Sequence, residues 1–206
     1  MLKRAWSWAA VVLTAALFFF LATSGRVEAA RWLEPVDTAA LPKASGLDLA
    51  GKPVDPLERA AGKPLVLIYV RSDCPISNRY APTVKALGQK YAGQAVFMLV
   101  YPDKAETSQA IEKHLKEYGY PFAPLRDPQH ELVKIGKVEI TPEVAVFNGQ
   151  RELIYHGRID NWYKDFGRAR PAPTTHELDE AVKSAVNGGP APASVGGVGC
   201  YISDLQ

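Results

Sequence analysis

The sequence predicts one α/β domain in which a central mixed sheet is flanked by helices, with an N-terminal hairpin and a C-terminal tail. Apolar strand-like runs alternate with segments of helical period along most of the chain, and this order predicts a layered α/β arrangement. The 206 residues are 47% hydrophobic and 22% charged. Such a balance is typical of a globular domain with a buried core.

The first half of the domain shows a hairpin followed by a β-α-β pattern. Apolar residues alternate within residues 46–56 around Ala50-Gly51, which predicts a hairpin. Residues 65–70 are apolar on both faces, as in a buried central strand. Large apolar side chains at spacings of three and four predict a helix over residues 76–91. Residues 95–102 form a second apolar run, so the two strands are expected to be parallel.

The second half predicts further helices and an antiparallel end to the sheet. Helices are expected over residues 108–118, 130–135 and 175–186. Asn148-Gly149 joins two strand-like runs and is a strong hairpin signal. Residues 187–206 are rich in Gly, Ala and Pro, so they are expected to form a tail that is flexible for most of its length.

Residues 1–29 have the pattern of a targeting segment. Lys3 and Arg4 precede an uncharged apolar stretch over residues 5–22, and small residues within residues 27–29 suit cleavage after Ala29. The stretch is also close to the length needed to span a bilayer, so a single uncleaved membrane anchor is the alternative. Both alternatives predict export, either to the periplasm or to the outer face of the cytoplasmic membrane.

The remaining boundaries and the charge follow from composition. Residues 30–45 are expected to be a linker, and residues 46–186 the folded domain. The formal net charge of +2 arises within the targeting segment, so the rest of the chain is close to neutral. A nucleic-acid surface needs a local excess of Lys and Arg, and none is expected here.

Cys74 and Cys200 are the two cysteines of the chain. In an oxidising compartment they are expected to pair with each other or with a partner. Cys74 lies where a strand ends and a helix begins, so unpaired backbone N–H groups and the helix dipole would stabilise its thiolate. Arg71 or Arg79 could add positive charge, whereas Asp73 opposes it. We therefore predict a reactive thiol; the alternative is a buried structural cysteine.

Several motifs resemble those of a known superfamily. The segments DCPISNRYAP, VYPD, TPEVAVF, YHGRID and VGCYI occur in that order. Together with the element order, they resemble the redoxin branch of the thioredoxin-like superfamily, which includes the alkyl hydroperoxide reductases and thiol-specific antioxidants, and in particular its exported bacterial members. The resemblance covers about residues 41–186. It implies a thioredoxin-like fold with a cis-proline at Thr141-Pro142, beside the active-site cysteine, and a Thr141 backbone within reach of substrate.

Two positions depart from the family patterns. Peroxiredoxins carry Thr or Ser three residues before the reactive cysteine, where this chain has Arg71, and thioredoxins carry a second cysteine where this chain has Ser77. Neither standard mechanism therefore transfers intact. The residues expected to support Cys74 or bind substrate are Asp73, Pro75, Ser77, Arg79, Thr141 and Pro142.

Cys200 is expected to act as the resolving cysteine. The segment from Asn187 to Cys200 spans at most roughly 43 to 47 Å when extended, and the domain's radius of gyration is about 15 to 16 Å, so contact with Cys74 is possible. Cys74 would attack a peroxide or a protein disulfide, and Cys200 would then release the product by forming an intramolecular disulfide. The alternative is a permanent structural disulfide, worth roughly 5 kcal/mol in the chain-entropy model.

A copper site is the second functional hypothesis. Two thiols and a histidine would make a soft site for Cu(I), as in the Sco-type copper proteins that share this fold. Cys74, Cys200 and His130 are the candidate ligands, with His156 as another candidate histidine. The redox hypothesis requires no cofactor, and its partner is a peroxide or a thiol or disulfide protein.

Residues 155–173 gather several charged and aromatic side chains in a short irregular segment. Such a segment could line a partner or ligand surface. More often, such a segment is a loop held by its own salt bridges and aromatic packing.

Overall fold

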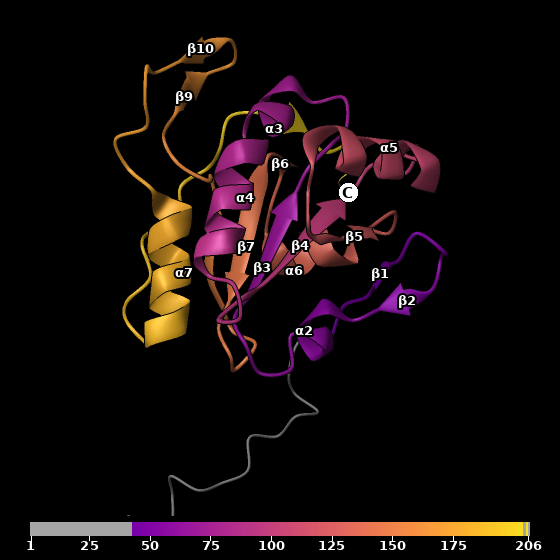
Figure 1. The fold of residues 1–206 in the computed structure, drawn as a ribbon, viewed down its shortest axis with the longest axis horizontal. Coiled ribbons are helices and arrows are strands. Elements are labelled where there is room, and N and C mark those ends of the chain that lie inside the picture. Colours follow the sequence, from indigo (N-terminus) through magenta and orange to yellow (C-terminus); the bar gives the residue numbers. More distant parts are fainter. Residues whose placement is uncertain (1–42, 204, 206) are drawn as a thin grey trace, which may run out of the picture. The chain divides into compact units, whose positions relative to one another are not determined.

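The computed structural model describes residues 43–203 and residue 205. Within this part of the chain, a seven-stranded mixed sheet has the order β2-β1-β5-β4-β3-β7-β8, and helices lie on both of its faces (Figure 1). The predicted α/β architecture is therefore confirmed. The predicted targeting segment lies outside the described residues, and among the described residues no helix is long and apolar enough to cross a membrane.

The strands of the main sheet are β1 (Gly46–Leu47), β2 (Pro53–Val54), β3 (Leu65–Tyr69), β4 (Val96–Tyr101), β5 (Ala123–Arg126), β7 (Glu143–Phe147) and β8 (Leu153–Gly157). The short strands outside it are β6 (Ile140–Thr141), β9 (Tyr163–Asp165), β10 (Arg168–Ala169) and β11 (Cys200–Tyr201). The helices are α2 (Pro56–Arg59), α3 (Pro75–Arg79), α4 (Ala81–Lys90), α5 (Ser108–Tyr118), α6 (Glu131–Gly136) and α7 (Glu177–Asn187).

Most predicted strand pairings are present. β3 and β4 are parallel, β1 and β2 form the predicted N-terminal hairpin, and β7 and β8 form the antiparallel pair at the other edge. No strand was predicted at residues 123–126, but β5 pairs in parallel with β4. Its four residues include Pro124, and proline with so short a run hides the strand pattern.

The central strands are buried on both faces because their side chains alternate between two apolar cores. Along β3, Val66 and Ile68 join the core cluster that includes residues of α3, α4 and α7. Leu65, Leu67 and Tyr69 join a second cluster that includes residues of α2 and α6. Strand β3 is therefore held from both sides, and the loop that follows it starts from a rigid support.

The predicted helix over residues 76–91 is in fact two helices. α3 ends at Arg79 and α4 begins at Ala81, with Tyr80 as the residue between them. Pro82 explains the interruption, because it has no N–H to donate to the carbonyl of Asn78 and its ring would clash there. The break leaves α3 as a short separate element that carries Cys74 at its start.

The tail differs from the flexible segment that we expected. From Val195 onward it contacts the domain at successive points. Val195 forms a parallel bridge with Gly157, β11 pairs antiparallel with β6, and Ile202 is buried in the core cluster that includes residues of α2 and α6. The glycine composition that suggested flexibility allows close backbone contact instead, since a side chain at Gly199 would collide with the Thr141 carbonyl.

Candidate active site

Cys74 lies at the carboxyl end of the buried strand β3, where the chain turns into α3. It is the N-cap of α3, and Pro75 occupies the first turn. Proline suits this position because its missing N–H would have no helical partner. The backbone N–H groups of Ile76 and Ser77 are directed at the Cys74 sulfur. The thiol itself is buried, with none of the residue exposed.

Thr141 and Pro142 lie beside this thiol, as the resemblance implied. Their peptide bond is cis, and the Thr141 carbonyl oxygen is 3.3 Å from Cys74 Sγ. Because Thr141 belongs to β6, the same residue also forms the strand edge on which the tail is seated.

The tail brings Cys200 to Cys74. In the antiparallel pair of β6 and β11, Cys200 lies opposite Thr141 and Tyr201 lies opposite Ile140. Both cysteines are free thiols, and their sulfurs are 2.8 Å apart. Two residues separated by 126 positions are therefore placed in direct contact. Figure 1 shows the yellow C-terminal segment running past the end of the sheet near α3.

The pKa of the Cys74 thiol is lowered. Burial alone would raise it, but the hydrogen bond from Cys200 Sγ, the Ser77 side chain and the N–H groups of Ser77 and Ile76 together outweigh burial. All of these groups stabilise the thiolate. The Ser77 hydroxyl is buried and forms no hydrogen bond of ordinary geometry with a described residue.

The pKa of Cys200 shifts in the opposite direction. Burial raises it most, and the hydrogen bond to Cys74 and the negative charge of the Cys74 thiolate raise it further; Arg71 lowers it. Within the pair, Cys74 is therefore the thiol that loses its proton more readily. This asymmetry matches the roles of nucleophile and resolving thiol.

Among the charged residues proposed near Cys74, Arg71 and Asp73 form one cluster and Arg79 lies apart. Arg71 pairs with Asp73 at 2.9 Å and with Asp103 at 3.4 Å, and its guanidinium is 3.5 Å from the Tyr201 carbonyl oxygen. Arg71 therefore contacts the tail.

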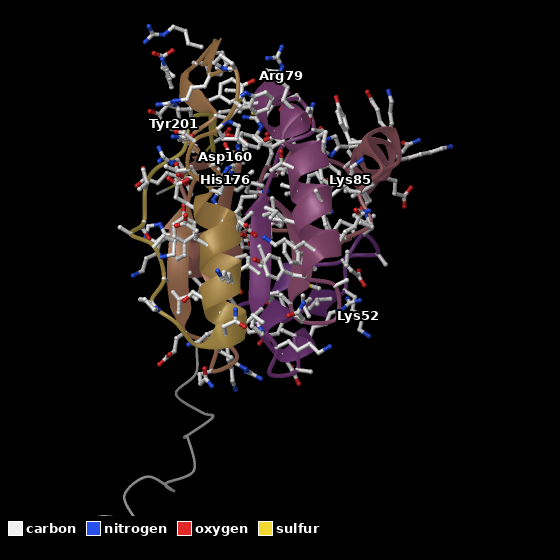
Figure 2. All side chains as sticks on the ribbon, turned by 60° about the vertical axis from the view of Figure 1, so that its left-hand side comes forward. Lys52, Arg79, Lys85, Asp160, His176 and Tyr201 are labelled. Atoms are coloured by element: carbon white, nitrogen blue, oxygen red, sulfur yellow. The ribbon has the colours of Figure 1, made fainter. Side chains whose placement is uncertain are left out.

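Arg79 instead donates to the Tyr163 hydroxyl at 3.2 Å. Arg79 is not among the groups that shift the Cys74 pKa. Figure 2 shows Arg79 and Tyr201 toward one end of the domain and Lys52 toward the other.

The loop before Cys74 is held by polar side chains that the sequence did not indicate. Glu106 accepts a hydrogen bond from the Ser72 N–H at 2.8 Å, and Asn78 donates to the Ser72 carbonyl at 2.9 Å. Asn78 Oδ1 in turn is 2.8 Å from His114 Nε2, and Tyr101 Oη is 2.8 Å from His114 Nδ1. Because an amide oxygen only accepts, Nε2 carries the proton and Nδ1 accepts from Tyr101.

The hydrogen bonds around His114 predict that the stability of the protein depends on pH. Burial lowers the pKa of His114, although Glu117 opposes the shift. The unfolded histidine titrates near about 6.5, so below that pH the unfolded chain binds the proton first and the free energy of unfolding falls. Urea denaturation from pH 8 to pH 5 is expected to show this loss in the wild-type protein and a weaker loss in His114→Gln. The exposed His176 is the control, and an equal effect of His176→Gln would contradict the assignment.

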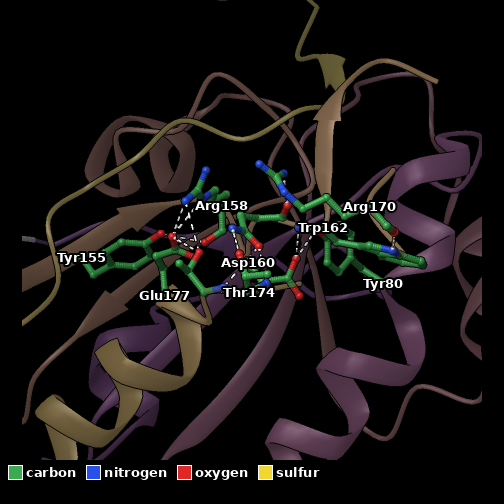
Figure 3. A network of polar contacts seen from close by, with 10 residues as sticks. Tyr80, Tyr155, Arg158, Asp160, Trp162, Arg170, Thr174 and Glu177 are labelled. Carbon is green, nitrogen blue, oxygen red and sulfur yellow. Dashed lines mark hydrogen bonds and ion pairs between the residues drawn. The ribbon is translucent and has the colours of Figure 1, made fainter. Parts of the chain in front are cut away.

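Residues 155–173 mostly contact one another and their neighbours (Figure 3). The Tyr80 hydroxyl donates to Asp160 at 2.6 Å, and the backbone N–H of Trp162 donates to the same carboxylate at 2.8 Å. Arg158 Nε is 3.1 Å from Glu177 at the start of α7. The segment is thus held by internal hydrogen bonds and an ion pair, which was the second of the two interpretations offered for it.

The candidate copper ligands do not gather in one place. Among the described residues, no group of three or more His, Cys, Asp or Glu side chains is arranged to hold a metal ion. The His130 ring lies against the Pro102 carbonyl oxygen, 3.1 Å from Nε2. The structure thus brings Cys74 and Cys200 together without His130.

The family model described as Redoxin matches residues 35–165. The chain belongs to the Redoxin family. No curated protein matches the redoxin.

Solved structures share the fold of this redoxin at low sequence identity. A hypothetical protein from Sinorhizobium meliloti is 21% identical with a TM-score of 0.65, covering 79% of this chain and 93% of the other. An uncharacterized conserved protein from Geobacillus kaustophilus is 21% identical with a TM-score of 0.66, covering 81% and 93%. A thioredoxin-like protein from Aeropyrum pernix is 17% identical with a TM-score of 0.50, covering 56% and 81%. The redoxin domain therefore has a thioredoxin-like fold.

Proposed function

We propose that this redoxin is a thiol–disulfide oxidoreductase in which Cys74 is the nucleophile and Cys200 is the resolving cysteine. The observation that carries the proposal is the 2.8 Å contact between the two sulfurs, together with the lowered pKa of Cys74 and the raised pKa of Cys200. Membership of the Redoxin family supports thiol chemistry at this position. We also propose that the domain works outside the cytoplasm, on the basis of the apolar targeting pattern of residues 1–29.

The reaction is a two-electron exchange in two steps. The Cys74 thiolate attacks one sulfur of a substrate disulfide; a bond forms between them, and the other substrate sulfur leaves as a thiolate that takes up a proton. Cys200, losing its proton, then attacks Cys74 Sγ, and the second substrate sulfur leaves as a thiol. The substrate disulfide is reduced and Cys74–Cys200 is oxidised. Two molecules of a small thiol, or one reduced protein dithiol, return the pair to its starting state and are themselves oxidised to a disulfide.

The contacts of Cys200 change in a way that favours the second step. Once Cys74 is bound to substrate, its thiolate no longer exists. The hydrogen bond and the charge that raise the pKa of Cys200 are then removed, while Arg71 still lowers it. Burial of Cys200 remains. The resolving thiol therefore loses its proton more readily after the first step than before it.

Two alternatives remain distinguishable from this proposal. A permanent structural disulfide would need no thiolate on Cys74, and the lowered Cys74 pKa argues against that role as the main one. A copper site would use the same two sulfurs, but the candidate His130 ring contacts Pro102. The geometry therefore favours sulfur exchange over either alternative.

The test is a pH titration of thiolate absorbance in the wild-type protein, Cys74→Ser and Cys200→Ser. Cys74 is expected to ionise below the free cysteine value of about 8.5, and Cys200 above it. Because Cys200 Sγ donates a hydrogen bond to the Cys74 sulfur, and a serine hydroxyl could donate in its place, the Cys74 midpoint should rise in a further variant, Cys200→Ala. The proposal is wrong if Cys74 ionises at or above the free value and the oxidised pair also resists excess dithiothreitol.

A further inference from the structure

The tail occupies an extended groove on the domain surface. We define the tail groove as the edge of β6 together with Glu139, Pro142 and Glu143, contacted by residues 197–202. The Ile202 N–H donates to the Glu139 carbonyl at 3.0 Å, and β11 pairs with β6 through the backbone. The Gly197 N–H donates to the Glu143 carboxylate at 2.8 Å.

All three contacts use backbone atoms of the tail. A groove that binds backbone accepts any extended chain that presents the same donors and acceptors. The residues of the tail that matter for recognition are therefore those whose side chains meet the groove. Cys200 is one of them, because pairing opposite Thr141 places its sulfur on Cys74.

The position before the cysteine has no room for a side chain. A Cβ atom added at Gly199 would lie 1.9 Å from the Thr141 carbonyl oxygen and 2.6 Å from its carbon. Both atoms belong to the backbone beside the cis-proline, so they cannot turn away as a flexible side chain would. Gly196, three residues earlier, differs sharply: a Cβ there meets nothing closer than 4.0 Å.

The second position before the cysteine is roomier. Val198 borders two hollows of the surface. One has a volume of about 260 Å³ and is also lined by Pro142 and Tyr163; the other has a volume of about 590 Å³ and lies beside Phe166 and Tyr201. A larger apolar side chain at this position would have space. The groove therefore excludes a side chain immediately before the cysteine and tolerates one a residue earlier.

We propose that the substrate of this redoxin is an extended polypeptide with glycine immediately before its reactive cysteine, which replaces the tail on β6 in the register that Cys200 now holds. The inference rests on the thiol–disulfide exchange proposed above. Substrate and tail then occupy the groove alternately. The tail leaves while Cys74 attacks the substrate disulfide, and it returns when Cys200 attacks Cys74 Sγ and releases the substrate thiol.

The test uses peptides of the tail sequence 195–202, each with its cysteine joined to thionitrobenzoate as a mixed disulfide. Attack by Cys74 on the peptide sulfur releases the coloured thiol. With full-length Cys200→Ser protein, the native peptide is expected to react at least about tenfold faster than the same peptide with alanine before its cysteine. A peptide with leucine in place of the valine two residues before the cysteine is expected to react as fast as the native one.

A matched pair of tail variants tests whether the tail and the peptide compete. In the Cys200→Ser background, Gly199→Ala should push the tail out of the groove and raise the rate with the native peptide several-fold. Gly196→Ala adds the same methyl group where there is space, and should leave the rate unchanged. Thermal unfolding of each variant checks that the domain remains folded.

Two results would overturn the inference. One is equal rates for the glycine and alanine peptides, and the other is equal effects of Gly199→Ala and Gly196→Ala. The peptide comparison needs no glycine variant, so it decides the matter even if Gly199→Ala unfolds. Reaction with glutathione disulfide separates the two proposals: if Cys74 fails to react with it, the thiol–disulfide function is wrong. If Cys74 reacts with it but does not distinguish the peptides, only the preference for glycine is wrong.

Discussion

Cys200→Ser protein, treated with glutathione disulfide, is expected to retain glutathione on Cys74 at least about 100-fold longer than the wild-type protein does. In the wild-type protein the Cys200 sulfur is held in contact with Cys74 Sγ, and such placement gives a high effective concentration. Without that sulfur, release depends on thiols from solution. Acid quenching followed by intact-mass measurement gives the lifetime of the mixed disulfide directly.

Tyr201→Ser is the matched control for this experiment. It introduces the same residue one position along the tail, and Tyr201 is 78% exposed. The contact of Arg71 with this position is to the backbone carbonyl, so it should survive the change. The lifetime in Tyr201→Ser is expected to equal that of the wild-type protein. A short lifetime in Cys200→Ser would mean that Cys200 does not resolve the intermediate.

Asp160→Ala is expected to lower the free energy of unfolding by about 2 to 3 kcal/mol. Its carboxylate is buried and accepts hydrogen bonds from Tyr80 Oη and the Trp162 N–H. Removing it leaves the buried Tyr80 hydroxyl without its charged acceptor, and an unsatisfied buried donor is costly. Urea denaturation measures the change. The substitution is also expected to destabilise the active site, because Tyr80 joins α3 to α4.

A double-mutant cycle isolates the Tyr80 to Asp160 contact. Tyr80→Phe and Asp160→Ala together are expected to cost less than the sum of the single variants, by about 1 to 2 kcal/mol. Asp165→Ala serves as the surface comparison, since the Asp165 side chain is half-exposed and pairs with the exposed Arg168; it should leave stability unchanged. Additive effects of the two buried substitutions would show that the contact does not contribute to stability.

The hydrophobic periodicity of the sequence was sufficient to predict those strands and helices whose structure is determined mainly by their own residues. Residues 65–70 are apolar on both faces, so a buried central strand was the natural prediction, and β3 confirms it. The helix over residues 108–118 was predicted at the bounds of α5. The Pro82 interruption could have been found from the proline rule alone, but the apolar spacing on either side of it outweighed that signal.

The site was predictable only in part, because its members come from distant segments. The position of Cys74 follows from its place between a strand and a helix, and Thr141-Pro142 came from the resemblance. No local sequence pattern indicated that Cys200 pairs with β6. This pairing depends on the edge of β6 and on glycines that resembled those of a linker. Glu106 and His114 were missed for a similar reason. Glu106 contacts the loop before Cys74 from another loop, and His114, on α5, contacts Asn78, which supports that loop.

The separation of the two cysteines also bears on how the molecule assembles. Contacts between residues 126 positions apart require nearly the whole domain to be ordered first, because the entropy of closing so long a loop is lost before the contact stabilises anything. The sheet and its helices would form before the tail is seated. Assembly of the thiol pair is therefore a late event in folding, and a partly folded chain would have Cys74 without Cys200 beside it.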